Sequence, residues 1–243
     1  MPSTFDEHQS HSQTSELNPQ KISILDWNIY KGQGHNWERD LLDLAADKDI
    51  ILLQEASMSE KLRQTLAKKK LFWNFNSAFK YRGIETGVLM ASTIQPVESC
   101  GLRYSEPIIG LPKTSLISKY LLADSPDELW VVNTHSINIT LGTRAYQAQL
   151  KSLQQVLAEH DGPLIVAGDF NDWSEQRTDI LNLFIEELSL RATVFKNKKR
   201  TTFFGTPVDH VLYRGLVPIR HEVHTVTSSD HNAISVTFHI ATN

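Results

Sequence analysis

The chain has a single cysteine, Cys100, among its 243 residues. One thiol cannot form an intramolecular disulfide, and no second cysteine stands at the spacing of a zinc or redox motif. A Gly-x-Ser-x-Gly pattern is also absent, so neither cysteine nor serine nucleophilic catalysis is indicated. We therefore interpret Cys100 as a structural thiol and expect a reducing compartment.

Long apolar runs and an excess of positive charge are lacking too. No stretch approaches the roughly 18 apolar residues of a membrane span, and residues 1–20 have no apolar segment of a signal peptide. The formal net charge is −4, which argues against non-specific coating of nucleic acid. An anionic substrate must then be held locally. We expect a soluble, cytoplasmic protein and a monomer.

The periodicity that is present predicts one α/β domain. Residues 1–20 are rich in Ser, Gln, His and Thr, which predicts a disordered tail. From Lys21 on, buried strands alternate with amphipathic helices and no linker interrupts the pattern. We expect residues 21–243 to form a single domain with two packed mixed β-sheets flanked by helices, in the α/β (α+β) class.

The individual elements follow from apolar spacing and capping signals. Asn36 is a candidate cap for the first helix, and Ser57 with Glu60 suggests a capping box for the second. Helices are predicted over 36–46, from the Ser57 cap to about Lys69, over 140–160 and over 177–188. Strands are predicted over 22–29, 49–54, 72–79, 87–92, 95–102, 114–123, 129–134, 164–168, 207–213, 216–226 and 233–240.

Polar residues recur where the predicted strands end or begin. An Asp or Asn after a strand is commonly turn chemistry, and a lone histidine is commonly a buried structural one. Their joint recurrence is harder to attribute to turns, because oppositely directed strands of a mixed sheet bring such ends to one rim. The residues concerned are Asn28, Glu55, His135, Asp169, Asn171, Asp209, Asp230 and His231.

The segments around these residues resemble the endonuclease/exonuclease/phosphatase (DNase I-like) superfamily, in a small uncharacterised bacterial branch. They occur in the family's order and cover nearly all of 22–240. They read Trp27-Asn28-Ile29, Gln54-Glu55, Gly87-Val88-Leu89, Asn133-Thr134-His135, Gly168-Asp169-Phe170-Asn171, Val208-Asp209-His210-Val211 and Ser229-Asp230-His231. The resemblance implies a four-layer sandwich and hydrolysis of a phosphate ester.

The resemblance also implies a magnesium site. Glu55 resembles the principal carboxylate ligand of Mg²⁺, with Mn²⁺ as a substitute, and Asn28 and Asp230 match the same metal and phosphate neighbourhood. The chemistry agrees, since a hard cation with oxygen ligands neutralises the charge that develops on a phosphodiester.

The remaining matched residues are implied to act on water and phosphate. Asp169 resembles the carboxylate that positions the attacking water, and Asn171 the amide that holds the phosphate. His231 resembles a general base oriented by Asp209, an arrangement that fixes the tautomer of the imidazole. His135 resembles a second histidine that contacts the phosphate in the branch of pancreatic-type DNases and sphingomyelinases.

The substrate stays open between a nucleic acid and a small or lipid phosphate, because this fold hosts all of them. A nuclease or phosphodiesterase is favoured, a phosphatase or phospholipase-like enzyme is the alternative, and a catalytically inactive binding module is the third. Tyr30 stands where some DNA-repair members have Asp, which weakens an assignment to abasic-site repair. Long apolar loops that would face lipid are not evident.

Weaker candidates lie outside the motifs. Lys31 and Lys113 are possible cations for the substrate, and Arg144 and Gln147 near the start of a helix are possible phosphate contacts. The basic run from Lys196 to Arg200 is expected to be a solvated face outside the cleft. His210 should point away from Asp209, because neighbouring strand residues face opposite sides.

Overall fold

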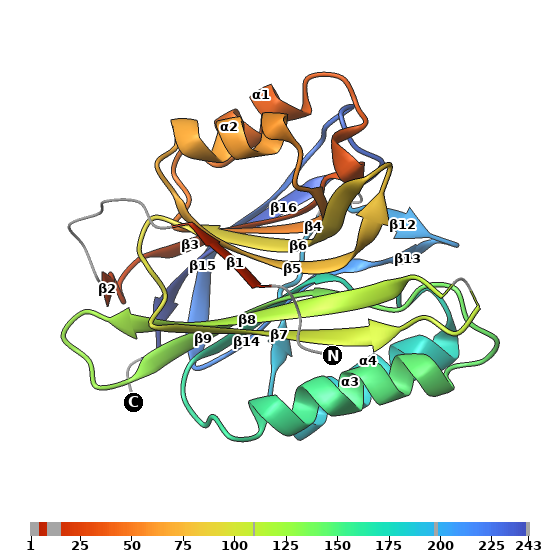
Figure 1. The fold of residues 1–243 in the computed structure, drawn as a ribbon. Coiled ribbons are helices and arrows are strands. Elements are labelled where there is room, and N and C mark those ends of the chain that lie inside the picture. Colours follow the sequence, from red (N-terminus) through yellow and green to blue (C-terminus); the bar gives the residue numbers. More distant parts are fainter. Residues whose placement is uncertain (1–4, 9–15, 109, 197–198, 242–243) are drawn as a thin grey trace.

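A computed structural model of the chain describes residues 5–8, 16–108, 110–196 and 199–241. Two mixed β-sheets pack face to face, with α1 and α2 over the outer side of one and α3 and α4 over the outer side of the other (Figure 1). This confirms the predicted four-layer arrangement. Within the described ranges, every helix is too short or too polar to traverse a bilayer.

The first sheet carries α1 (Trp37–Leu44) and α2 (Glu60–Lys68). Its two central strands, β3 and β4, are parallel, and the other pairings are antiparallel. In spatial order the strands are β1 (Phe5–His8), β5 (Phe72–Tyr81), β6 (Ile84–Ser92), β4 (Ile50–Ser57), β3 (Ile22–Asn28), β16 (Ala233–Ile240) and β15 (Leu216–His224).

The second sheet carries α3 (Arg144–Leu157) and α4 (Glu175–Glu187). Its order is β11 (Arg191–Ala192), β14 (Asp209–Arg214), β10 (Leu164–Asp169), β9 (Glu128–His135), β8 (Pro112–Leu122) and β2 (Glu16–Leu17), with β7 (Glu98–Ser105) also paired to β8. A separate hairpin joins β12 (Thr202–Phe203) to β13 (Thr206–Pro207).

Both faces of the central strands are buried, which explains their nearly continuous apolar sequences. Ile24 and Leu52 face Val131 and Ile165 in the core between the sheets. The adjacent Leu25 points outward and packs beneath α1 and α2. Strand alternation thus divides one apolar run between two cores.

The N-terminal prediction requires correction. Residues 16–17 form a strand parallel to β8, and Leu17 is buried in the core between the sheets. Residues 5–8 pair with β5. The expectation of a disordered tail therefore fails for these residues, because edge pairing supplies order that polar composition does not reveal. Residues 1–4 and 9–15 lie outside the described residues.

The helix starts also differ from the predicted caps. Ser57 belongs to β4, and Ser59 caps α2 by accepting a hydrogen bond from the Leu62 amide at 3.3 Å. Asn36 does precede α1, but it is in the left-handed conformation and its side chain makes no capping bond. The residue types predicted both of these helix starts to within two residues. The strand register decided which serine was free to cap α2.

Candidate active site

The strand ends that carry the polar residues meet at one edge of the two sheets. In the second sheet, Asp169 lies beside His135 on one side and Asp209 on the other. The first sheet joins them through Asn28, whose side-chain amide donates to Asp169 Oδ2 at 3.1 Å. Tertiary packing therefore brings together the residues that the sequence motifs singled out.

His231 and Asp209 form a hydrogen-bonded pair. His231 Nδ1 lies 2.9 Å and 3.0 Å from the two Asp209 carboxylate oxygens. Burial alone lowers the pKa of His231, but the charge of Asp209 and its hydrogen bond outweigh burial and raise that pKa to about 10. Trp27 anchors the backbone on which His231 stands, since its indole N–H donates to the His231 carbonyl at 2.9 Å.

Asp169 is a buried carboxyl group in the middle of the cluster. Its Oδ2 lies 3.9 Å from His231 Nε2, and its Oδ1 accepts a hydrogen bond from the backbone N–H of Asn171 at 3.2 Å. Burial raises the pKa of Asp169 to about 6; the charge of His231 opposes this rise, and that of Asp209 adds to it. A carboxyl group with this pKa gains and loses its proton close to neutral pH.

His135 is held as a neutral imidazole. Lys113 Nζ lies 2.8 Å from His135 Nε2. An ammonium group only donates, so Nε2 accepts and the ring proton sits on Nδ1. Burial, with the charges of Lys113 and His231, lowers the pKa of His135 well below its ordinary value. The 3.5 Å approach of His135 Nε2 to Asp169 is therefore not an ion pair.

Lys113 is the clearest residue that the motifs missed. It precedes Thr114 at the start of β8, opposite the end of β9, so strand pairing carries it to His135. Burial lowers the pKa of Lys113, although Glu55 and Asp169 oppose that effect. Its place after a Gly-Leu-Pro turn was the available sequence signal, and a turn alone does not identify a partner.

Glu55 is aimed by an irregularity in β4. The register of β4 with β6 shifts between Leu53 and Ala56, and Glu55 has φ 50°. Such a bulge redirects a side chain at the end of a strand, and a non-glycine residue with this φ is strained. The carboxylate of Glu55 contacts the ammonium of Lys31. Lys31 is thus a partner of Glu55 rather than a solvated lysine.

The residues expected to hold Mg²⁺ fit a hard cation. Glu55 follows Gln54, which is level with Asn28 in the parallel register. The Ser229 hydroxyl donates to the Asn28 carbonyl at 2.7 Å and lies 3.4 Å from Asp230 Oδ1, so the Asp230 segment is tied to the same place. The Lys31 ammonium against Glu55 shows that this position attracts positive charge.

A second group of possible ligands is Asp169, Asp209 and His231, whose atoms lie within 4.8 Å of one another. Asp209 and His231 are already bonded to each other. Asp169 is occupied by Asn28. A cation on Glu55, Asn28 and Asp230 would leave the His231–Asp209 pair intact, but it would have to replace the Lys31 ammonium at Glu55.

A buried polar network beneath the site was not anticipated from sequence. Gln54 Nε2 donates to Asp26 Oδ1 and to Asn133 Oδ1, both at 2.7 Å, which joins the two sheets. Burial, followed by the charge of Asp209, raises the pKa of Asp26 well above its ordinary value. An acid inside the apolar run of β3 was the sequence signal for this group.

Gly168 explains why Asp169 can be placed so close to β9. It has φ 141°, and a Cβ there would lie 1.9 Å from the Thr134 carbonyl oxygen. Only glycine fits such a contact. The glycine of the Gly-Asp-Phe-Asn motif therefore sets the backbone position of the catalytic candidates that follow it.

The weaker sequence candidates separate into those near the site and those away from it. Arg200 donates to the Asp209 carbonyl, so the end of the basic run is beside the His231–Asp209 pair and not outside the site. His210 contacts Asp172 at 2.9 Å on the far side of β14 from Asp209, as strand alternation predicts. Residues 197–198 lie outside the described residues.

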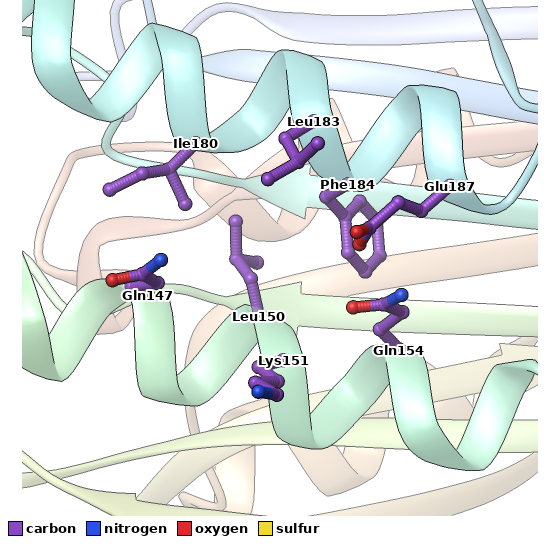
Figure 2. Close-up of a pocket in the computed structure, with 8 residues that line it drawn as sticks. All are labelled: Gln147, Leu150, Lys151, Gln154, Ile180, Leu183, Phe184 and Glu187. Atoms are coloured by element: carbon purple, nitrogen blue, oxygen red, sulfur yellow. The ribbon is translucent and has the colours of Figure 1, made fainter.

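Gln147 does not join the cluster. It lines a groove of about 200 Å³ between α3 and α4, on the outer helical layer (Figure 2). Leu150, Leu183 and Phe184 give it an apolar lining, and Lys151 and Glu187 also line it. Arg144 is exposed at the first turn of α3. These positions give Gln147 no role at the strand-end site.

The sequence matches the Endonuclease/Exonuclease/phosphatase family over residues 27–231, and the chain belongs to this family. It is 41% identical to a UPF0294 protein of Vibrio parahaemolyticus over 219 residues, which cover 90% of this chain and 78% of that one. A UPF0294 protein of Vibrio cholerae is 39% identical over 223 residues, with the same shares covered. These relatives indicate a small bacterial branch.

Solved structures share the fold at low sequence identity. The human Nocturnin catalytic domain with bound sulfate has a TM-score of 0.70 at 18% identity, covering 99% of this chain and 100% of that one. The TDP2 protein of D. rerio in complex with a single-strand DNA product has a TM-score of 0.68 at 17% identity, covering 90% and 98%. At this identity the likeness establishes the DNase I-like fold.

Proposed function

We propose that this protein hydrolyses a phosphodiester by metal-assisted, in-line attack of water, with Mg²⁺ as the metal and Mn²⁺ as a substitute. The observation that carries the proposal is the alignment of His231, Asp209 and Asp169, with His231 Nε2 left facing Asp169 at 3.9 Å. A histidine oriented by one carboxylate and facing another is suited to move a proton from water.

Each residue has a role in the proposed reaction. Asp169 positions the water, and Asp209 keeps the imidazole in the orientation with Nδ1 toward the carboxylate. His231 accepts the proton of the water in its neutral form, which the raised pKa makes the minor form near neutral pH. The neutral His135 and the Lys113 ammonium contact phosphate oxygens, and the Asn171 amide holds the scissile phosphate. A cation on Glu55, Asn28 and Asp230 supplies charge neutralisation and lowers the pKa of nearby groups when bound.

We propose further that residues 21–243 act as one domain, as a monomer in the cytoplasm. The family match and the structural neighbours support phosphoester hydrolysis as the reaction class.

The test is hydrolysis of a water-soluble bis-aryl phosphodiester with Mg²⁺, with Mn²⁺ and with chelator. We expect turnover that requires the metal and is mostly lost in Glu55→Gln, together with weaker metal binding by calorimetry. Glu60→Gln is the control, because Glu60 is an exposed acid on α2. Metal-independent turnover, or equal metal affinity in Glu55→Gln and wild type, contradicts the proposal.

A further inference from the structure

Large apolar side chains are exposed around the edge that carries the site. Leu141 is 91% exposed and Phe204 is 80% exposed, and both lie on connections beside the catalytic strand ends. Isolated exposed apolar residues are ordinary, but a group of them on one face marks an interaction surface. We define the apolar rim as Ile84, Ile108, Leu111, Ile139, Leu141, Phe203 and Phe204.

Strand register places the first part of this rim next to the metal and phosphate residues. Ile84 follows the β5–β6 turn, beyond the pairing of Ser57 with Thr86 at the end of β4, where Glu55 lies. Leu111 precedes β8, whose Lys113 contacts His135. Both residues therefore stand at the edge at which β4 and β9 end.

The second part of the rim follows the second sheet. Ile139 and Leu141 lie in the connection that leaves β9 immediately after His135. Phe204 is at the turn of the β12–β13 hairpin, which precedes Asp209 and extends at the margin of the molecule (Figure 1). The Thr201 hydroxyl accepts the Asn232 amide at 2.7 Å, so the base of this hairpin touches the residue after His231.

Buried groups hold the rim loops together. The Glu106 carboxylate, which is itself buried, accepts the backbone amides of Asn138 and Ile139 at 2.8 Å and 2.6 Å. The loop with Ile108 is thereby fixed to the loop with Leu141. A carboxylate that accepts two amides in a buried place costs desolvation, and this cost is offset only if the loop geometry is maintained.

Arg177 connects these loops to the hairpin. Its buried guanidinium donates to the carbonyls of Ile137 and Asn138, both at 2.7 Å, and lies 4.7 Å from the Trp173 ring. Trp173 in turn lies 5.7 Å from the Phe204 ring. Polar and aromatic contacts therefore connect the loops of Ile108 and Leu141 with the hairpin of Phe204.

Phe204 occupies a position that folding alone does not favour. Phe204 and Gly205 form the two-residue turn of the hairpin with φ 50° and 84°. Asn, Asp or Gly suit the first position of such a turn, and a bulky aromatic residue there is strained. The backbone strain and the exposed ring both cost free energy in the isolated protein. Contact with a binding partner therefore explains Phe204 better than the needs of folding do.

The chemistry of the rim favours a lipid surface over a nucleic acid. Single-stranded nucleic acid is bound by aromatic rings that stack on bases and by cations that follow the backbone. Five of the seven residues of the rim are aliphatic, and aliphatic side chains do not stack on bases. An acyl boundary accepts aliphatic and aromatic groups alike.

Exposed cations accompany the rim. Arg82 lies in the turn before Ile84, Arg144 follows Leu141 at the start of α3, and Lys199 precedes the hairpin. Apolar side chains flanked by cations match a surface of acyl chains and anionic phosphates. The half-buried Lys113 lies deeper, beside His135, at the place where a phosphate ester is expected.

We propose that the apolar rim seats the active site on a phospholipid bilayer, and that the substrate is the phosphodiester of a lipid headgroup. This inference rests on the proposed phosphodiesterase function. Water adds to phosphorus and one P–O ester bond breaks. The released alkoxide takes the proton that the water loses, which yields a phosphomonoester and an alcohol.

The test compares vesicle binding and two hydrolysis rates. Vesicles of phosphatidylcholine and phosphatidylglycerol in equal amounts are sedimented with the wild type, with the double variant Leu141→Ser/Phe204→Ser and with the control Leu183→Ser/Val217→Ser. The control residues are apolar and 47% and 41% exposed, on the outer face of α4 and on β15. Hydrolysis of vesicle lipid and of the soluble bis-aryl phosphodiester is measured in parallel.

We expect the wild type and the control to bind the vesicles, and the rim variant to bind about tenfold more weakly or worse, since two apolar side chains leave the acyl boundary. The ratio of lipid to soluble turnover should fall by a similar factor. Equal binding by the rim and control variants overturns the proposal, as does a wild type that stays in solution.

The outcomes separate this inference from the proposed function. Vesicle binding through the rim without soluble turnover removes the phosphodiesterase and leaves the membrane contact. Turnover of the soluble substrate without vesicle binding supports the phosphodiesterase and removes the membrane contact. Preference for a single-stranded oligonucleotide, lost in the rim variant, assigns the rim to nucleic acid and overturns the lipid assignment.

Discussion

Replacing Asp209 with Asn tests the His231–Asp209 pair without depending on the substrate. The change keeps the size of the side chain and removes its charge. A rise in the pKa of His231 from 6.5 to about 10 corresponds to about 5 kcal/mol of preference for the imidazolium. We expect Asp209→Asn to return the pKa of His231 toward 6.5, because Asp209 is the main source of the rise.

The sign of the pH dependence follows from the raised pKa. A histidine whose folded pKa exceeds its unfolded value contributes its full stabilisation below about pH 6.5, and loses it as the pH rises through about 10. Breaking a buried pair costs about 3 kcal/mol. Asp209→Asn should therefore be less stable than wild type by about this amount at pH 6, and the difference should shrink toward pH 10.

Two measurements check this expectation. NMR titration of the imidazole protons, assigned with His231→Gln, gives the pKa of His231 in the metal-free wild type and in Asp209→Asn. Urea unfolding at pH 6 and pH 10 gives the stabilities, with the exposed Asp127→Asn as control. A wild-type pKa near 6.5, or a stability difference that does not change with pH, refutes the reasoning.

The same pair should act as one unit in catalysis. His231→Ala and Asp209→Asn should each slow single-turnover hydrolysis strongly, and the double variant should be little slower than the slower single variant. His210→Ala should affect stability more than rate, because His210 contacts Asp172 on the other side of the strand. Fully additive losses, or a greater loss of rate in His210→Ala than in His231→Ala, would show that the pairing is wrong.

Three further changes probe the supports of the site. Gly168→Ala should destabilise the fold by about 3 kcal/mol in urea unfolding, because its Cβ meets the Thr134 carbonyl, whereas Gly83→Ala, with nothing within 4 Å, should cost much less; equal costs would contradict this. Asp26→Asn should gain in stability relative to wild type as pH rises above about 4, since the raised folded pKa of Asp26 makes its contribution decline with pH; a constant difference between pH 5 and 8 would argue against a neutral Asp26. Lys113→Met should raise the pKa of His135 in NMR titration, because one of the charges that lower it is removed, and an unchanged value would remove Lys113 from that environment.

Local sequence patterns were sufficient for the layers and for the chemistry-bearing positions. The alternation over residues 233–240 predicted the inward faces of β16, and Ile234, Val236 and Phe238 are buried as expected. Helical spacing likewise located α3, within four residues at either end. These features depend on side-chain periodicity, which is a property of neighbouring residues.

Contacts between distant segments were decided only in the tertiary structure. Lys113 meets His135 because β8 and β9 are antiparallel at that register, and Lys31 meets Glu55 because a bulge turns the carboxylate toward it. Neither the register nor the bulge has a signature in the residues themselves. The sequence therefore supported Glu55 as a ligand candidate but not its lysine partner.

The burial of single residues was likewise only partly predictable from the sequence. Asp26 reads as an unusual acid within an apolar run, but its raised pKa arises from burial beside Asp209, a residue far along the chain. The apolar rim is assembled from four connections that are unremarkable one at a time. By itself, the sequence determined which residue types stand at the strand ends, because that pattern is local. Only the tertiary structure decided which charges and apolar side chains they face, because burial and electrostatic potential sum over neighbours that folding brings together.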